Sequence, residues 1–223
     1  MGRSASHACR YPTSFSLRPP LKMIREHKVP TIFSHVAVPL ALGFGLGRGA
    51  VPTRLLVAGV VAAALPDLDV LAFRLNVAYS HALGHRGFSH SLVFALALAL
   101  LALAWAPSLR SSRFAAFIFL GLAAVSHPLL DMFTNGGLGV ALWWPWSAER
   151  FFAPWPVIEV SPLSLHRLFS VRGVAVIKSE LLWVCLPAVV VGFALLALRA
   201  SSPTSRCWGG CTIKPRSLPE LEP

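Results

Sequence analysis

The sequence is poor in charged side chains and especially poor in acidic ones. Only 13% of its 223 residues are charged, with 9 aspartate and glutamate residues against 20 lysine and arginine residues. Soluble domains usually carry about 25% charged residues, so this shortage argues against an ordinary soluble domain. The 55% hydrophobic content and the mean hydropathy of +0.65 indicate a membrane protein instead.

Cysteine is also scarce, and the four cysteines carry little information. Cys185 lies in an apolar run, where cysteine usually behaves as a small hydrophobic residue. Cys207 and Cys211 are spaced CxxxC in a polar tail without a nearby histidine or cysteine partner. We interpret them as ordinary thiols rather than as a metal site or a disulfide.

The sequence contains several long apolar runs without a charged residue. A helix needs about 20 apolar residues to cross a bilayer, and the runs near this length cover residues 91–109, 114–130 and 181–198. Residues 29–47 are interrupted only by His35, whereas residues 55–65 are few and end at Pro66, which predicts a short or half-buried helix. The sequence therefore predicts an all-α, integral membrane helical bundle of about four to five hydrophobic helices.

Three parts of the chain differ in composition. Residues 1–28 are basic and lack the apolar core of a signal peptide, so we expect a flexible extension, with either Met1 or Met23 as the start. Residues 29–199 form the expected membrane-embedded, hydrolase-like domain. Residues 200–223 are rich in serine, proline and glycine and are expected to be a disordered tail.

The net charge of +11 and the pI of about 10.8 raise the question of nucleic-acid binding. The basic residues are dispersed over termini and loops, so we expect membrane lipid, and no nucleic acid, as a partner. Six of them precede the first apolar run, as in a cytoplasmic flank. We predict that residues 1–28 and 132–180 are cytoplasmic; with Arg74 and Arg86 this places twelve basic residues on that side and eight on the other.

Seven ionisable residues lie at the ends of the apolar runs: His35, Asp67, Asp69, His85, His90, His127 and Asp131. If successive runs cross in alternating directions, all seven fall at one membrane surface. An aspartate inside a span costs about 2.5–3.5 kcal/mol, so such residues normally pair, coordinate an ion or line a wet cavity. The sequence therefore predicts a polar His/Asp cluster at one membrane face.

The residue types in this cluster are those of a metal site. His127 and Asp131 are four residues apart, on one face of a helix. Imidazole and carboxylate ligands together suit Zn, Mn or Fe, and we expect a divalent ion, with Zn or Mn favoured. Seven candidates exceed the needs of one tetrahedral ion, so either two ions bind or some residues orient the ligands. Any one of them alone could be a buried structural residue or a partner of Arg86.

Ser-His pairs recur at 34–35, 80–81, 89–90 and 126–127, which raises the possibility of a serine hydrolase. Adjacent residues on a helix do not face each other, so we expect these serines to orient the site rather than to act as nucleophiles. His81 is left outside the predicted site, and His166 is interpreted as a surface residue.

The order of SH (34–35), PDLD (66–69), HRGFSHS (85–91), SHPLLDMFTNGG (126–137) and WPW (144–146) resembles the YdjM-like family over roughly residues 29–198. This family consists of bacterial inner-membrane proteins described as LexA-regulated, membrane-bound, predicted metal-dependent hydrolases. The resemblance implies a multi-pass inner-membrane location and an SOS-response link, and it supports the seven residues as a polar signature with Arg86 and Thr134 as companions. It supplies no substrate.

The leading interpretation is a membrane-bound metal-dependent hydrolase acting on a lipid-linked phosphate or acyl ester. Asp69 would act as general base, and Arg86 would stabilise developing negative charge. The alternative is a non-enzymatic membrane protein with a structural metal or His/Asp cluster, or a cation transporter, which should place its polar groups near the bilayer midplane. A third interpretation, a regulator acting by protein contacts, would depend on tails that contain no recognisable motif.

Overall fold

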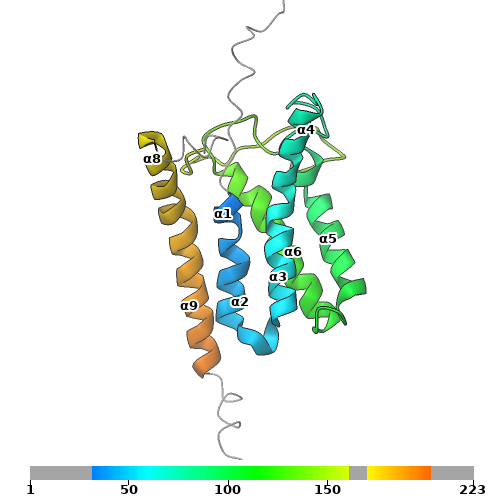
Figure 1. Ribbon diagram of the computed structural model, residues 1–223, viewed down its shortest axis with the longest axis vertical. Coiled ribbons are helices and arrows are strands. Elements are labelled where there is room, and N and C mark those ends of the chain that lie inside the picture. The colour runs from blue at the N-terminus through cyan, green and yellow to red at the C-terminus, as the bar shows by residue number, and fades with distance from the viewer. Residues whose placement is uncertain (1–31, 161–169, 202–223) are drawn as a thin grey trace, which may run out of the picture.

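The computed structural model describes residues 32–160 and 170–201 (Figure 1). The N-terminal extension, His166, Cys207, Cys211 and nearly all of the expected tail lie outside these ranges. The helices of the described part are α1 (Ile32–His35), α2 (Ala37–Ala50), α3 (Thr53–Ala64), η2 (Leu65–Val70), α4 (Leu71–Arg74), η3 (Phe88–His90), α5 (Leu92–Trp105), α6 (Arg113–Met132), α8 (Val171–Glu180), η4 (Leu181–Cys185) and α9 (Leu186–Ser201). The predicted all-α bundle is confirmed.

The helices differ from the predicted runs in their lengths. Three are long and apolar enough to cross a membrane: Thr53–Arg74, Arg113–Met132 and Val171–Ser201. The helix expected to be short is thus one of the long ones, because Pro66 stands at the start of the 3-10 turn η2, where its missing N–H is not needed. The last helix begins ten residues before residue 181, with Ser170 as its N-cap.

By contrast, α5 is shorter than the run at 91–109 that predicted it. Ser91 caps its N-terminus by accepting a hydrogen bond from the Phe94 amide. Its C-terminal end lies at Trp105, two residues before Pro107. Ala106 still has helical backbone angles, but Pro107 has no N–H to continue the helical hydrogen bonds, so the apolar composition of the run overestimated the helix.

Small side chains let the helices approach one another closely. The core between α3, α5 and α6 contains many alanines, among them Ala62, Ala95 and Ala116. On the other side of the bundle α9 packs beside α2 (Figure 1), and a Cβ on Gly45 would meet the backbone oxygen of Gly192 at 2.6 Å. Such small-residue contacts are typical of helices that associate within a bilayer.

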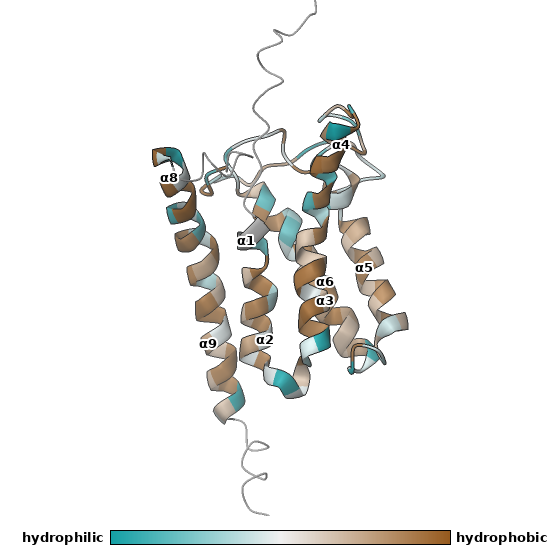
Figure 2. Cartoon of the chain, in the orientation of Figure 1, coloured by the Kyte–Doolittle hydropathy of each residue, from teal (hydrophilic) through white to brown (hydrophobic). Residues whose placement is uncertain are grey.

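The outer surface of the bundle is apolar and its ends are more polar (Figure 2). Leu100, Val190 and Phe193 are about half exposed on the outside of α5 and α9, as expected where lipid surrounds the helices. At one end of the bundle lie α1, α4 and the connection after α6 (Figure 1). Trp146 and Trp155 of that connection are strongly exposed, which suits the membrane–water interface.

Candidate metal centre

All seven predicted residues meet at the end of the bundle where α1 and α4 lie. Each comes from an element that begins or ends there: α1, η2, the turn before α5, and the last turns of α6. Six of the seven are at most 3% exposed, and Asp69 is 8% exposed. The convergence that was predicted from alternating runs is therefore observed, while metal binding by these residues stays a prediction.

The segment GHRGFSHS folds as a compact turn that ends in η3. Arg86 has a positive φ of 59°, which is uncommon for a side chain other than glycine or asparagine. A Cβ on Gly87 would collide with the Ala82 carbonyl, so only glycine fits there. Backbone hydrogen bonds hold Arg86 in place, since its N–H donates to Asp69 at 3.0 Å and its carbonyl accepts from Ala141 at 3.0 Å.

Arg150, in the long connection after α6, holds this turn in place by hydrogen bonds. The sequence did not indicate this role of Arg150. Its Nη1 donates to the carbonyls of His85 at 3.0 Å and Arg86 at 3.2 Å. Its Nη2 donates to the carbonyl of Tyr79 at 2.9 Å, and its guanidinium also lies over the Tyr79 ring. The only available signal was a lone cation within the aromatic stretch WWPWSAERFF.

Asp69 accepts hydrogen bonds from several groups of the same turn. Its Oδ2 accepts from Ser89 Oγ at 2.6 Å and lies 3.1 Å from His90 Nδ1, and its Oδ1 bonds to His85 Nδ1. A carboxylate that holds the Nδ1 of a histidine fixes the direction of the other ring nitrogen. This position favours an orienting role over the predicted roles of ligand and general base.

One sequence argument about serine is wrong for the pair Ser89–His90. Ser89 Oγ lies 3.0 Å from His90 Nδ1. The argument assumed an α-helix, whereas η3 is a 3-10 turn that brings the adjacent side chains together. Because Ser89 donates its proton to Asp69, the expected orienting role remains the better interpretation.

The centre of the cluster contains His90, His127 and Asp131. The two Nε2 atoms are 3.0 Å apart, and Asp131 Oδ2 lies 3.1 Å from His90 Nε2 and 4.0 Å from His127 Nε2. His127 Nδ1 donates to the Ala63 carbonyl at 2.6 Å, which leaves a lone pair on its Nε2. The Nε2 lone pair of His127, the Nε2 atom of His90 and a carboxylate oxygen therefore converge, and a proton on His90 or a cation must lie between them.

A second group adjoins the first through His127. The His35 and His127 rings stack with centroids 3.8 Å apart, and His127 Nε2 is 3.5 Å from Asp67 Oδ1. His35 Nε2 lies 3.4 Å from the other oxygen of Asp131. Donor atoms of His35, Asp67 and His127, and likewise of His90, His127 and Asp131, lie within 4.8 Å of one another.

Several atoms of these groups fit a divalent cation. Ligand atoms around a tetrahedral zinc ion are separated by about 3.3–3.5 Å, close to the spacings seen here. Within the described residues, both nitrogens of His35 and both oxygens of Asp67 are buried without a hydrogen-bond partner. A native protein rarely leaves so many buried polar atoms unsatisfied. The donor set suits Zn or Mn, and the shared His127 allows one ion or two neighbouring ions.

The histidines before α5 differ in their protonation. Burial lowers the pKa of His85 below its ordinary value, although its hydrogen bond to Asp69 acts in the opposite direction. Burial also disfavours charge on His90, but hydrogen bonds to Asp131 and Asp69 outweigh it and raise the pKa of His90 to about 9. His85 Nε2 is buried without a hydrogen-bond partner among the described residues, yet His85 belongs to neither group of three.

Arg86 and Thr134 both contact Asp131. Arg86 Nε lies 2.9 Å from Asp131 Oδ2 without the alignment of a hydrogen bond, and its Nη1 donates to the Gly136 carbonyl at 2.9 Å. Its Nη2 has no hydrogen-bond partner within the described part of the chain. Thr134 donates to the backbone carbonyl of Asp131 at 2.7 Å, so it supports the end of α6 rather than the metal groups.

Comparison with known proteins gives a consistent family match. The family described as YdjM inner membrane protein matches residues 30–203. The chain is 49% identical over 167 residues to the inner membrane protein YbcI of Escherichia coli (strain K12), covering 73% of this chain and 95% of that protein. No solved structure matches the chain. These matches and the three apolar helices make it a multi-pass protein of the bacterial inner membrane.

Proposed function

The chain belongs to the YdjM inner membrane protein family, and from this premise and the geometry of its buried cluster we propose that it is a membrane-bound, metal-dependent hydrolase. The observation that carries the proposal is the convergence of His90 Nε2, His127 Nε2 and Asp131 Oδ2 within 4.0 Å. His35 and Asp67 would complete the ligand set or hold a second ion. A divalent cation there would polarise a phosphoryl or acyl oxygen of the substrate.

The other residues would divide the remaining tasks. Asp69 and Ser89 would keep His85 and His90 in a fixed direction through their contacts at Nδ1. Asp67 is better placed than Asp69 to accept a proton, because neither of its oxygens has a hydrogen-bond partner among the described residues. The Nη2 of Arg86, which has no hydrogen-bond partner among the described residues, would face negative charge on the substrate. The position at a membrane surface favours a lipid-linked phosphate or acyl ester.

A structural metal is the second candidate function, and the burial of the cluster favours it. His90, His127 and Asp131 are 0% exposed, and an ion that only stabilises the fold has no need of substrate access. A cation transporter is less consistent with the cluster, because its residues come from α1, η2, the turn that ends in η3 and the last turns of α6, which meet at one end of the bundle and not near its middle.

One experiment separates these functions. The full-length protein is purified in detergent, its metal content is measured by mass spectrometry, and hydrolysis is assayed on phosphatidate, a polyprenyl pyrophosphate and a lysophospholipid. The hydrolase predicts bound Zn or Mn and turnover of one substrate class that chelation abolishes and metal restores. Metal-loaded protein that turns over none of them supports the structural metal, and protein without metal contradicts both.

Regulation by LexA is part of the same proposal, because it is implied by the resemblance to the YdjM-like family. Transcript levels in the native bacterium should then rise after treatment with mitomycin C and should remain flat in a strain with non-cleavable LexA.

A further inference from the structure

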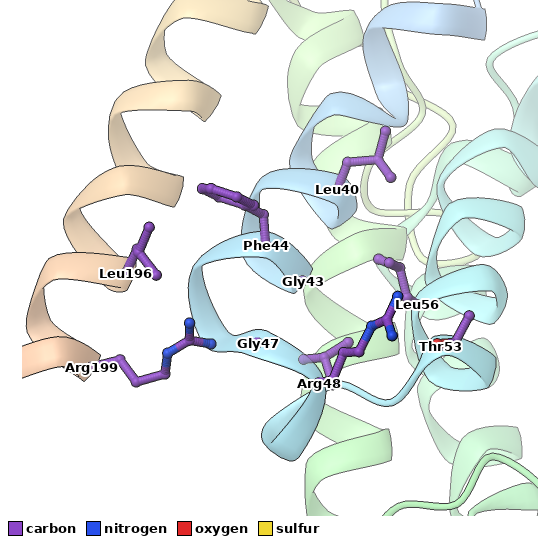
Figure 3. Close-up of a pocket in the computed structure, with 10 residues that line it drawn as sticks. Leu40, Gly43, Phe44, Gly47, Arg48, Thr53, Leu56, Leu196 and Arg199 are labelled. Atoms are coloured by element: carbon purple, nitrogen blue, oxygen red, sulfur yellow. The ribbon is translucent and has the colours of Figure 1, made fainter. Parts of the chain in front are cut away.

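A cavity of about 630 Å³ lies at the end of the bundle opposite the metal centre (Figure 3). It lies between α2, α3 and α9 and is open to the outside of the bundle. Its walls include the apolar side chains of Leu40, Phe44, Leu56 and Leu196. Two arginines, Arg48 and Arg199, also line it and lie toward the end of the bundle. Arg199 extends toward Gly47 from α9, whereas Arg48 extends toward Leu56 of α3 (Figure 3). The site thus combines a hydrocarbon wall with two guanidinium groups on different sides.

The backbone of α2 is shaped to admit one of these arginines. Gly47 has a φ of 74°, in the region that favours glycine. A Cβ at this position would overlap the guanidinium of Arg199, which extends toward Gly47 in Figure 3. Glycine at position 47 therefore allows both the bend of the chain and the close approach of the Arg199 guanidinium to the backbone of α2.

Among the described residues, the charged side chains in the turns at this end of the bundle are all positive. The segments 47–54, 106–113 and 198–201 contain five arginines and no acidic residue. Arg54 donates to the Ser108 carbonyl at 3.1 Å and so ties two turns together. Arg48 and Arg199 are exposed beside the cavity, and no carboxylate of these segments can neutralise them.

We propose that this cavity binds an anionic phospholipid, with its phosphate between Arg48 and Arg199 and an acyl chain along Leu40 and Phe44. Those two wall residues are 46% and 54% exposed, so the wall is open on the outer surface of the bundle, where lipid chains surround the protein. Basic pockets between transmembrane helices are suited to anionic headgroups, and arginine matches phosphate oxygens in two-pronged geometry.

A second hollow at the same end shows what the lipid site requires. It has a volume of about 510 Å³ and is lined by Pro52, Pro107, Arg110, Ser111 and neighbouring small residues. It has an arginine but no large aliphatic or aromatic side chain. A headgroup could be attracted there, but an acyl chain would find no wall, so the proposal concerns the first cavity alone.

The test titrates phosphatidylglycerol, or phosphatidylcholine with the same chains, into the full-length protein in detergent and counts bound lipids by native mass spectrometry. Wild-type protein should take up one phosphatidylglycerol before any phosphatidylcholine. Arg48→Gln and Arg199→Gln should each weaken this binding about fivefold, and the double variant by on the order of tenfold or more. Leu40→Trp, which fills the wall without changing charge, should also weaken it.

Arg113→Gln is the matched control, because Arg113 lies at the same end but lines neither cavity. It should leave lipid binding unchanged. An equal loss in Arg113→Gln would reduce the effect to diffuse surface charge and overturn the proposal, as would full binding by the double variant. Displacement of the lipid by millimolar glycerol phosphate would show that the acyl wall is unused and would also overturn it. Metal content should stay at the wild-type level throughout.

Discussion

The Nε2 atoms of His90 and His127 face each other at 3.0 Å, and the Nδ1 atom of each ring is engaged elsewhere. Asp69 of η2 holds the His90 ring, and the Ala63 carbonyl of α3 holds the His127 ring. The two Nε2 atoms are therefore fixed toward a common point by partners on different elements. A proton on His90 satisfies one of them, whereas a divalent cation satisfies both together with Asp131.

His127→Ala should remove bound metal, because His127 belongs to both candidate groups of ligands. We expect the metal content to fall below about a tenth of the wild-type value, while the protein still inserts in the membrane. Metal analysis of the detergent-purified variant measures this. His81→Ala is the control, since His81 is exposed and outside both groups. Full metal in His127→Ala would mean that the His/Asp cluster is not the metal centre.

Asp69→Asn should weaken metal binding without abolishing it. Asp69 orients His85 and His90 through their Nδ1 atoms, and loss of such a partner typically weakens metal affinity about 10- to 100-fold. Competition with a chromogenic chelator gives the affinity. Metal that cannot be restored even at saturating concentration would make Asp69 a direct ligand, as the sequence alone suggested.

The bundle was predictable because apolar run length and the points where charge interrupts it are local properties of a chain. The ends of the helices were not. At 66 the sequence shows a proline and an acidic residue, which usually end a helix, yet the 3-10 turn η2 carries the chain on to Arg74. Residues 171–180 include the charged side chains of Arg172, Lys178 and Glu180, so the search for uncharged runs missed this helix. It nevertheless continues into α9, because charged residues are compatible with helix near the end of a span.

The membership of the cluster was predictable from topology, but the division of tasks was not. Asp67 and Asp69 are equivalent in the pattern DxD, and only the path of η2 directs Asp67 toward His127 and Asp69 toward the turn at His85. The contact of Ser89 with His90 depends on η3 being a 3-10 turn. Arg150 acts across more than sixty residues of sequence on backbone carbonyls, which leave no side-chain pattern to read.

Arg150→Gln should loosen the turn that holds His85 and Arg86. Its guanidinium donates to the carbonyls of Tyr79, His85 and Arg86, and hydrogen bonds from a charged donor contribute about 1.5–3 kcal/mol each. We expect a lower midpoint of thermal unfolding in detergent, together with weaker metal binding, although no ligand is changed. Arg172→Gln, which changes an exposed residue on α8, should alter neither the thermal midpoint nor metal binding. A similar loss in Arg172→Gln would mean that removal of any positive charge has this effect.

The two ends of the bundle should be labelled from opposite sides of the membrane. In a variant without native cysteines, Leu75→Cys and Leu138→Cys place thiols at exposed positions of the end that contains the metal centre. Arg113→Cys places one at the other end. A membrane-impermeant maleimide should reach only Arg113→Cys in intact spheroplasts, because the predicted topology puts residues 1–28 and 132–180 in the cytoplasm. Labelling of Leu75→Cys and Leu138→Cys, but not of Arg113→Cys, would show that the protein has the opposite orientation. Labelling of only one of these two variants would show that their segments lie on opposite sides of the membrane.

Arg86→Lys should distinguish the hydrolase from a structural metal. Lysine keeps a positive charge near Asp131, where Arg86 Nε now lies at 2.9 Å, so metal content should be retained. Lysine lacks the planar guanidinium that donates to Gly136 through Nη1 and leaves Nη2 without a partner among the described residues. If that nitrogen stabilises charge on the reacting group, kcat should fall on the order of 100- to 1000-fold, with metal affinity and the thermal midpoint close to wild type.

Arg74→Lys is the matched control for this change, since Arg74 is an exposed arginine at the same end of the bundle. It should keep full turnover. If Arg86→Lys also kept full turnover, the buried pair of Arg86 and Asp131 would be a structural ion pair alone. A parallel loss of metal and thermal stability in Arg86→Lys would lead to the same conclusion, because the arginine would then act by holding Asp131 in place. Only a fall in kcat at constant metal content assigns Arg86 to the chemistry.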